Sequence, residues 1–276
     1  MKRFLACCLL LAVLTGCGAA VPAAGLKDTR QVPILMYHSV LKDPARTGAY
    51  VIAPERLEQD LLWLLNEGYE TVVLGDLLRF VRGAGELPEK PVVITFDDGY
   101  LNNVTYVLPL LQKHGCRAVL SVVGAYTARF SENPDPNPSY AYVAWDDVTA
   151  LRLTDRFEIQ NHTFDMHGQS GRMGSGRRRG ESQRAYAAAF TKDVQRLQEE
   201  LANRCGVTPE FFTYPFGLID PDSRALLEKL GFSGSLSCAA RWNTVTQGDG
   251  DCLWGMGRYN RPGDLSTEAF MGTVFG

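Results

Sequence analysis

The stretch Pro91-Val92-Val93-Ile94-Thr95-Phe96 decides the fold that we predict for this chain. It holds one polar residue and shows no alternation of apolar and polar side chains, which is typical of a strand buried on both faces of a parallel sheet. Two carboxylates, Asp97 and Asp98, follow it at once, with Gly99 behind them. The sequence therefore predicts a central buried strand that ends in a pair of acidic side chains.

Outward from this strand, short apolar runs alternate with amphipathic segments. We predict further strands over residues 33–37, 70–74, 117–123, 156–161, 210–213 and 232–236. We predict helices over residues 54–66, 76–81, 105–114, 145–151, 181–204 and 221–230, the first with Leu57, Leu61, Leu64 and Leu65 on its buried face. This alternation is typical of a parallel sheet with crossover helices. Because no linker interrupts it, we expect one barrel-like α/β domain with its chemistry at the C-terminal ends of the strands.

The composition narrows the class of protein. The 276 residues are 45% hydrophobic and 21% charged, enough to bury a core, which excludes collagen-like and disordered chains. The formal net charge of −3 gives no basic field of the kind that nucleic acids attract. The apolar runs also stay below the roughly 18 residues of a membrane-spanning helix.

Three polar clusters follow predicted strands. The first is the pair Asp97 and Asp98, which alone is also compatible with an ordinary surface turn, because Asp and Gly are common in turns. The third is Tyr214-Pro215-Phe216-Gly217, where proline and glycine predict a sharp exit from a strand. Such an exit can expose a backbone N–H to a site, or be a turn and nothing more.

The second cluster holds two of the four histidines, His162 and His167, five positions apart. On a helix this spacing leaves the side chains about 140° apart, and on a strand it places them on opposite faces. They can meet only if the chain turns between them. With a carboxylate from Asp98 they would form a mixed nitrogen and oxygen site suited to zinc; two unrelated loop histidines are the alternative.

Together and in this order, the clusters resemble the motifs of the polysaccharide deacetylases of carbohydrate esterase family 4, which share the NodB-homology domain. Residues 95–99 resemble the first motif, the histidine pair the second, and residues 214–217 the third. The resemblance covers roughly residues 32–263. It implies a distorted (β/α) barrel of about seven strands in a single domain.

The run 33–40, Pro-Ile-Leu-Met-Tyr-His-Ser-Val, resembles the opening of the poly-β-1,6-N-acetylglucosamine deacetylases. In that subgroup a histidine that other members carry near the C-terminus stands at the start of the barrel. This chain fits, because no histidine follows His167. His38 would then be the counterpart of that histidine. The alternative is that His38 is an ordinary polar residue at a strand end, with its hydrogen bonds satisfied.

The resemblance implies a metal-dependent hydrolase that removes N-acetyl groups from polysaccharide containing N-acetylglucosamine and releases acetate. Asp98, His162 and His167 would hold a divalent metal, expected to be Zn²⁺, with Co²⁺ or Ni²⁺ as alternatives. Asp97 would act as the general base. His38 would protonate the leaving amine.

The third motif implies the remaining contacts. The backbone N–H of Phe216 would stabilise the oxyanion, and Tyr214 and Pro215 would lie against the substrate. Most family members carry an arginine that braces the catalytic aspartate two residues before the proline, where this chain has Thr213. Arg258 is our candidate for the replacement cation.

Two features have no fixed place in this scheme. Trp242 and Trp254 could stack on sugars, although core packing is the favoured interpretation. The segment 168–180 holds four arginines and five glycines. It could bind an anionic polymer or anionic lipid headgroups, or be a solvated flexible loop.

The N-terminus predicts export. Lys2 and Arg3 precede an apolar stretch over residues 4–14, as in a secretory signal. Leu14-Thr15-Gly16-Cys17 resembles a bacterial lipobox, which implies cleavage before Cys17 and a lipid on its sulfur. We therefore expect a signal peptide over 1–16, the lipidated Cys17 with a linker over 17–30, and the catalytic domain over 31–276. The protein would be anchored to the outer face of the bacterial cell membrane; cleavage near residues 20–24, giving a soluble secreted protein, is the alternative.

Besides the lipidated Cys17, four cysteines remain after the predicted cleavage: Cys116, Cys205, Cys238 and Cys252. An even number outside the cytosol permits disulfides. Cys238 and Cys252 could form one, and buried free thiols are equally compatible with a chain of this length.

Three other functions compete with the first. One is a deacetylase that acts on the N-acetylglucosamine of peptidoglycan, which the predicted lipid tether would also suit. A non-catalytic carbohydrate-binding lipoprotein could keep the same barrel, although retention of the acidic pair and both histidines argues against it. A glycosidase would need two carboxylates about 5–9.5 Å apart across a scissile bond, which the adjacent Asp97 and Asp98 do not readily provide. The expected partners are the polysaccharide and the membrane, with no nucleic acid and no obligate protein partner.

Overall fold

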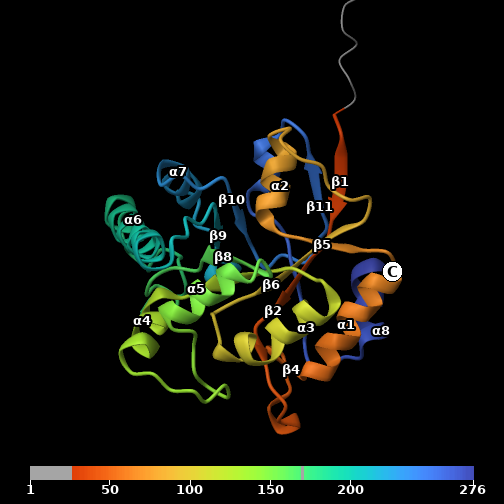
Figure 1. The fold of residues 1–276 in the computed structure, drawn as a ribbon. Helices are drawn as coiled ribbons and strands as arrows, with labels where there is room; N and C mark the ends of the chain where they lie inside the picture. Colours follow the sequence, from red (N-terminus) through yellow and green to blue (C-terminus); the bar gives the residue numbers. More distant parts are fainter. Residues whose placement is uncertain (1–26, 169–170) are drawn as a thin grey trace, which may run out of the picture.

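The computed structural model describes residues 27–168 and 171–276 (Figure 1). The predicted signal peptide, 1–16, and the predicted lipidation site, Cys17, lie outside the described residues. Of the helices in the described ranges, none is long and apolar enough to cross a bilayer.

A parallel eight-stranded sheet forms the centre of the molecule. Its order is β10-β9-β8-β7-β6-β2-β12, and β5 pairs with β6 off this path. The strands are β2 (Ile34–Tyr37), β5 (Glu70–Val72), β6 (Pro91–Phe96), β7 (Ala118–Val122), β8 (Phe157–Asn161), β9 (Phe211–Thr213), β10 (Gly234–Leu236) and β12 (Tyr259–Asn260). The main path of the sheet curls into a half-barrel within one domain, so the predicted barrel of about seven strands is confirmed.

The segment 256–260 connects the two edges of this sheet. Met256 forms a parallel bridge with Leu236 of β10, and β12 at the other end of the segment pairs with β2. Arg258 lies between these two contacts. It is therefore held at the place where the half-barrel comes closest to closing.

Helices connect and cover the strands (Figure 1). They are α1 (Pro54–Asn66), α2 (Leu74–Val81), α3 (Leu108–His114), α4 (Gly124–Glu132), α5 (Trp145–Leu153), α6 (Gln183–Glu200), α7 (Ser223–Lys229) and α8 (Thr267–Phe275). Two predicted helices include a π-helical turn, over Asn103–Val107 before α3 and over Leu201–Cys205 after α6. Two small pairs complete the fold, β1 (Thr29–Val32) with β11 (Asn243–Thr246) and β3 (Ser39–Val40) with β4 (Val51–Ile52).

Some sequence predictions were wrong in detail. Leu65 does not belong to the buried face of α1, where it is 38% exposed. Asp60 is fully buried on that helix instead, because Arg261 and Thr267 bond its carboxylate. The strand predicted over 70–74 ends at Val72, and α2 begins at Leu74. The elements α4, α8, β1, β3, β4, β11 and β12 were not predicted.

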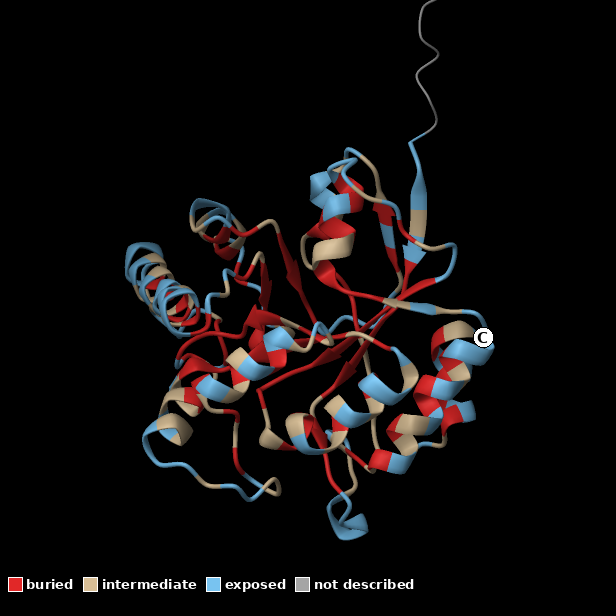
Figure 2. Cartoon of the chain, in the orientation of Figure 1, coloured by how far each residue is buried: buried red, intermediate tan, exposed pale blue. Residues whose placement is uncertain are grey.

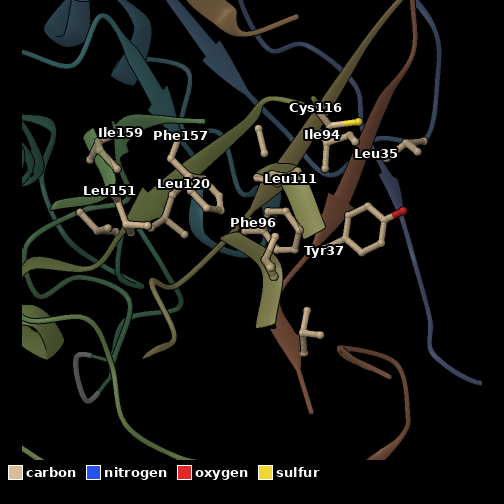
Figure 3. Close-up of a cluster of buried hydrophobic side chains, with 14 of the residues drawn as sticks. Leu35, Tyr37, Ile94, Phe96, Leu111, Cys116, Leu120, Leu151, Phe157 and Ile159 are labelled. Atoms are coloured by element: carbon tan, nitrogen blue, oxygen red, sulfur yellow. The ribbon is translucent and has the colours of Figure 1, made fainter. Parts of the chain in front are cut away.

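The core lies between the sheet and its helices. All six residues of β6 are buried, and β2 and β7 to β10 are buried along most of their length, while the helices keep exposed outer faces (Figure 2). Figure 3 shows part of the largest cluster, where Phe96, Leu120 and Phe157 from neighbouring strands pack with Leu111 and Leu151 from the helices. This packing fixes the end of β6, where the acidic pair begins.

The four cysteines of the described ranges are unpaired. The disulfide considered between Cys238 and Cys252 is therefore absent. Cys116 and Cys205 are buried free thiols.

Candidate active site

The chain leaves β6 through a strained turn that separates the two carboxylates. Asp98 has a φ of 72° and Gly99 a φ of 78°. A left-handed conformation is costly for a residue other than glycine, and such outliers concentrate at functional sites. Asp97, one position earlier, donates its N–H to the carbonyl of Tyr37 at 3.0 Å. Because of this turn, the adjacent side chains contact different partners: Asp97 contacts Arg258, and Asp98 contacts the two histidines.

Asp97 binds Arg258 in a buried, bidentate ion pair. Arg258 Nη1 and Nη2 lie 2.7 and 2.9 Å from the two carboxylate oxygens, and the side chains are 0% and 3% exposed. Arg258 also donates to the carbonyl of Ser237 and to Thr95 Oγ1. Burial alone raises the pKa of Asp97, but Arg258 and His162 outweigh burial and hold this pKa below its usual range. Asp97 is therefore ionised and firmly oriented.

Asp98 faces both histidines of the second cluster. Its Oδ1 lies 3.5 Å from His162 Nε2 and 3.2 Å from His167 Nε2, and the ligand atoms of the three residues all lie within 4.8 Å of one another. Burial raises the pKa of Asp98, but the two imidazoles outweigh burial and hold it well below its usual range. The structure thus brings together the three residues predicted to bind a metal.

The turn between the histidines is built from local and distant contacts. Thr163 has a φ of 72°, and its N–H donates to Asn161 Oδ1 at 2.9 Å. The carboxylate of Asp193, on α6, accepts the N–H groups of Phe164 and Asp165 at 2.7 and 2.9 Å. Asp193 therefore holds the loop that carries His167. Sequence reasoning missed it, because an acidic residue within a long helix gives no local signal.

The donor set fits a divalent cation. His162 Nδ1 lies 2.8 Å from the carbonyl of Thr213, so Nδ1 donates its proton to that carbonyl and the lone pair of Nε2 is available to a cation held beside Asp98. Asp98 Oδ1 is buried and has no aligned hydrogen-bond partner among the described residues. One carboxylate oxygen and two imidazole nitrogens are ligands that zinc and similar ions accept.

His38 lines one cavity with Asp97, Asp98, His162 and His167. Its ring packs edge-on against Tyr50, with centroids 4.8 Å apart, and its Nδ1 is buried without a hydrogen-bond partner among the described residues. Burial lowers the pKa of His38, although Asp97 and Asp98 act in the opposite direction. A protonated His38 is therefore a stronger acid than a solvent-exposed histidine.

The third cluster contributes one residue to the cavity. Phe216 has a φ of 58°, is 54% exposed, and packs its ring on His167 with centroids 4.8 Å apart. The cavity has a volume of about 400 Å³. Its lining residues are Met36, His38, Tyr50, Asp97, Asp98, Tyr100, His162, His167, Phe216, Cys238 and Asn260.

A family model described as polysaccharide deacetylase matches residues 84–235, which is more than half of the chain. The chain belongs to the polysaccharide deacetylase family. The matched range begins before β6 and includes both carboxylates, both histidines and Phe216.

Curated relatives of this polysaccharide deacetylase carry a more specific name. A poly-beta-1,6-N-acetyl-D-glucosamine N-deacetylase of Escherichia coli (strain K12) is 26% identical over 219 residues, covering 72% of this chain and 32% of that protein. One of the same name from Staphylococcus aureus (strain MRSA252) is 22% identical over 200 residues, covering 72% of this chain and 65% of that protein. The chain thus spans about a third of the length of the Escherichia coli relative.

Solved structures share the fold. The de-N-acetylase from Aggregatibacter actinomycetemcomitans superposes with a TM-score of 0.73 at 22% identity, covering 87% of this chain and 99% of that one. IcaB from Ammonifex degensii gives 0.70 at 22% identity, covering 89% and 96%.

The remaining predicted site residues of this polysaccharide deacetylase lie outside the cavity lining. Tyr214 is buried among apolar side chains with its hydroxyl 2.7 Å from Ser223 Oγ, and Pro215 is also buried. Trp242 donates to the carbonyl of Val274 and packs on Phe275, and Trp254 joins the same apolar cluster as Tyr214. Tyr50, Tyr100, Cys238 and Asn260 line the cavity and were missed, because single residues outside a motif carry no pattern.

Proposed function

We propose that this polysaccharide deacetylase removes N-acetyl groups from a polysaccharide that contains N-acetylglucosamine, using a divalent metal, most readily Zn²⁺. The observation that carries the proposal is one cavity that holds the set of Asp98, His162 and His167 beside an ionised Asp97. The names of the Escherichia coli and Staphylococcus aureus relatives support this choice of substrate.

The reaction adds one water across an amide bond. The water oxygen bonds to the acetyl carbon, the carbon–nitrogen bond breaks, and the nitrogen gains a proton, giving acetate and a free amine. A divalent cation, when bound, would acidify a water and polarise the carbonyl. Asp98, His162 and His167 would hold that cation, and Asp97, fixed by Arg258, accepts the proton of the attacking water.

The leaving amine and the developing oxyanion need separate groups. The low pKa of His38 suits proton transfer to the amine nitrogen. Phe216, in its left-handed conformation beside His167, offers its backbone N–H to the oxyanion. Both residues line the cavity that also contains the acidic pair.

Metal removal tests the proposal directly. We expect the mature protein to release acetate from purified poly-β-1,6-N-acetylglucosamine, to lose this activity after chelation, and to regain it when Zn²⁺, Co²⁺ or Ni²⁺ is restored. Metal analysis of the untreated protein should find about one ion per chain. Peptidoglycan is assayed in parallel, and faster release from it would assign the wall glycan as substrate. No release from either glycan, with metal bound, would favour a carbohydrate-binding protein.

We also propose that the protein works at the outer face of the bacterial membrane, tethered through a lipid on Cys17. The lipobox-like Leu14-Thr15-Gly16-Cys17 supports this location. Replacing Cys17 with serine should release the protein from the membrane fraction.

Tyr50 should bind a sugar ring. It is 59% exposed and lies beside His38 in the cavity lining, whereas among the other aromatic side chains of the described residues only Tyr140 and Phe216 are similarly exposed. Covering about 60 Å² of the ring at about 25 cal/mol/Å² contributes about 1.5 kcal/mol, which is roughly tenfold in affinity. We therefore expect Tyr50→Ala to raise KM for an N-acetylglucosamine oligomer about tenfold with kcat little changed. Tyr140→Ala is the matched control, because Tyr140 is 52% exposed outside the cavity lining.

A further inference from the structure

The arginine-rich segment is tied to the protein's own acids. Arg172 is buried and donates to Glu181 Oε1 at 2.6 Å and to the carbonyl of Gly176 at 2.7 Å. Arg177 makes two bonds to Asp220, at 3.0 and 3.1 Å, and pairs with Asp222. These two arginines are therefore engaged within the chain, which weakens the idea that they bind an anionic polymer or lipid.

The same contacts join the segment to the third motif. Asp220 lies just after Phe216, and Arg177 stacks over Tyr186 of α6 at 5.1 Å. The Tyr186 hydroxyl donates to the carbonyl of Ser175 at 3.2 Å. The segment 171–181 is thus fixed to α6 on one side and to the chain after Phe216 on the other.

Gly174 brings the segment into direct contact with the motif. It has a φ of +55°, and a Cβ at this position would lie 2.7 Å from the carbonyl oxygen of Pro215 and 3.0 Å from Phe216 Cδ2. A Cβ at Gly217, on the other side of Phe216, would lie 2.7 Å from the backbone N of Cys238. Phe216 is therefore held between two close backbone contacts, in a conformation that its own side chain disfavours.

We propose that the segment 171–181 is a clamp that positions Phe216 for catalysis, with Gly174 as its contact point and Arg177 as its anchor. This inference rests on the proposed function, because it assigns a purpose to the place of the Phe216 N–H. Oxyanion donors act through exact placement, and displacing a positioned group by about 1 Å can cost about a hundredfold in rate. Gly174 and Arg177 are positioning residues, since they act through Phe216.

The test compares two glycine substitutions. Gly174→Ala and Gly231→Ala both place alanine in a left-handed conformation, but Gly231, with a φ of +87° and outside the clamp, has no neighbouring atom within 4 Å of its added Cβ. We expect Gly174→Ala to lower kcat for acetate release on the order of tenfold to a hundredfold with KM unchanged. Gly231→Ala should keep the wild-type kcat. Gly174→Ala should have the lower thermal midpoint of the two, because its Cβ meets the Pro215 carbonyl in addition to the backbone strain that both variants share.

A second pair of variants decides the matter if Gly174→Ala does not fold. Arg177→Gln removes the anchor, and its control Arg224→Gln removes an arginine that likewise pairs with two acids, Asp251 and Glu228, and stacks on Trp254. We expect only Arg177→Gln to lower kcat at constant KM, with partial recovery in Arg177→Lys.

The outcomes separate this inference from the proposed function. Equal kcat values for each variant and its control, in an active enzyme, would overturn the clamp alone. A rise in KM without a fall in kcat would also overturn it, because the segment would then bind substrate. A wild-type protein that releases no acetate would overturn both.

Discussion

Asp97→Asn should lower kcat for acetate release by on the order of 10²- to 10⁴-fold, the range for loss of a general base. Asparagine has nearly the same shape but cannot accept the proton of the attacking water. The native carboxylate is kept ionised by Arg258, 2.7 Å away, despite its burial. Acetate release and bound metal per chain, measured on the same preparation, check this prediction.

The metal content distinguishes a lost base from a lost site. Asp97→Asn should keep about one ion per chain, because Asp98 and the histidines are unchanged. Asp165→Asn is the control: this exposed carboxylate lies on the loop between the histidines but outside the cavity lining, and its kcat should match the wild type. Unchanged kcat in Asp97→Asn would remove Asp97 from the role of base.

Hydrophobic pattern was sufficient to predict the centre of this fold. The run Pro91–Phe96 is buried at every position, and the alternation of strands and helices gave the parallel sheet, because both follow from which side chains avoid water. The hydrophobic pattern was weaker in the short outer strands. The burial of β1 changes from exposed to buried along four residues, and β12 has only two, so neither shows a readable period.

Helix α1 shows a feature that its local sequence does not reveal. Its bounds match the prediction, but its buried face includes Asp60, which was not expected there, and excludes Leu65, which was. The reason is Arg261, more than two hundred positions along the chain, which bonds both oxygens of Asp60. A buried carboxylate is tolerated only beside such a partner, and no local window of sequence contains it.

The residues of the candidate site could be predicted from the sequence, whereas the contacts that hold them in place could not. The spacing of His162 and His167 required a turn, and the structure has one at Thr163. The groups that hold this turn and its loop, Asn161 and Asp193, depend on tertiary contacts. The sequence left the arginine-rich segment open between an anion-binding element and a solvated loop, since charge in a sequence does not reveal whether its partners lie within the chain.

Arg258→Met should destabilise the protein by about 3–5 kcal/mol and suppress activity at neutral pH. Removing one partner of a buried ion pair leaves an uncompensated charge, which is the costly case. Without Arg258, burial raises the pKa of Asp97. Because a base must be deprotonated, activity should then appear only at higher pH than in the wild type. Denaturant unfolding and the pH profile of kcat measure the two effects.

Two further variants test these explanations. One breaks a second buried ion pair, and the other combines Asp97→Asn with Arg258→Met. Arg261→Met breaks the fully buried pair with Asp60, outside the cavity lining, so it should lose similar stability while the folded fraction keeps its kcat and pH profile. Asp97→Asn combined with Arg258→Met removes both charges, and should therefore be more stable than Arg258→Met alone yet remain inactive at every pH. If the double variant is no more stable than Arg258→Met, loss of packing by the arginine, rather than the stranded charge of Asp97, accounts for the destabilisation. If Arg258→Met keeps the wild-type pH profile, Arg258 has no part in setting the proton affinity of the base.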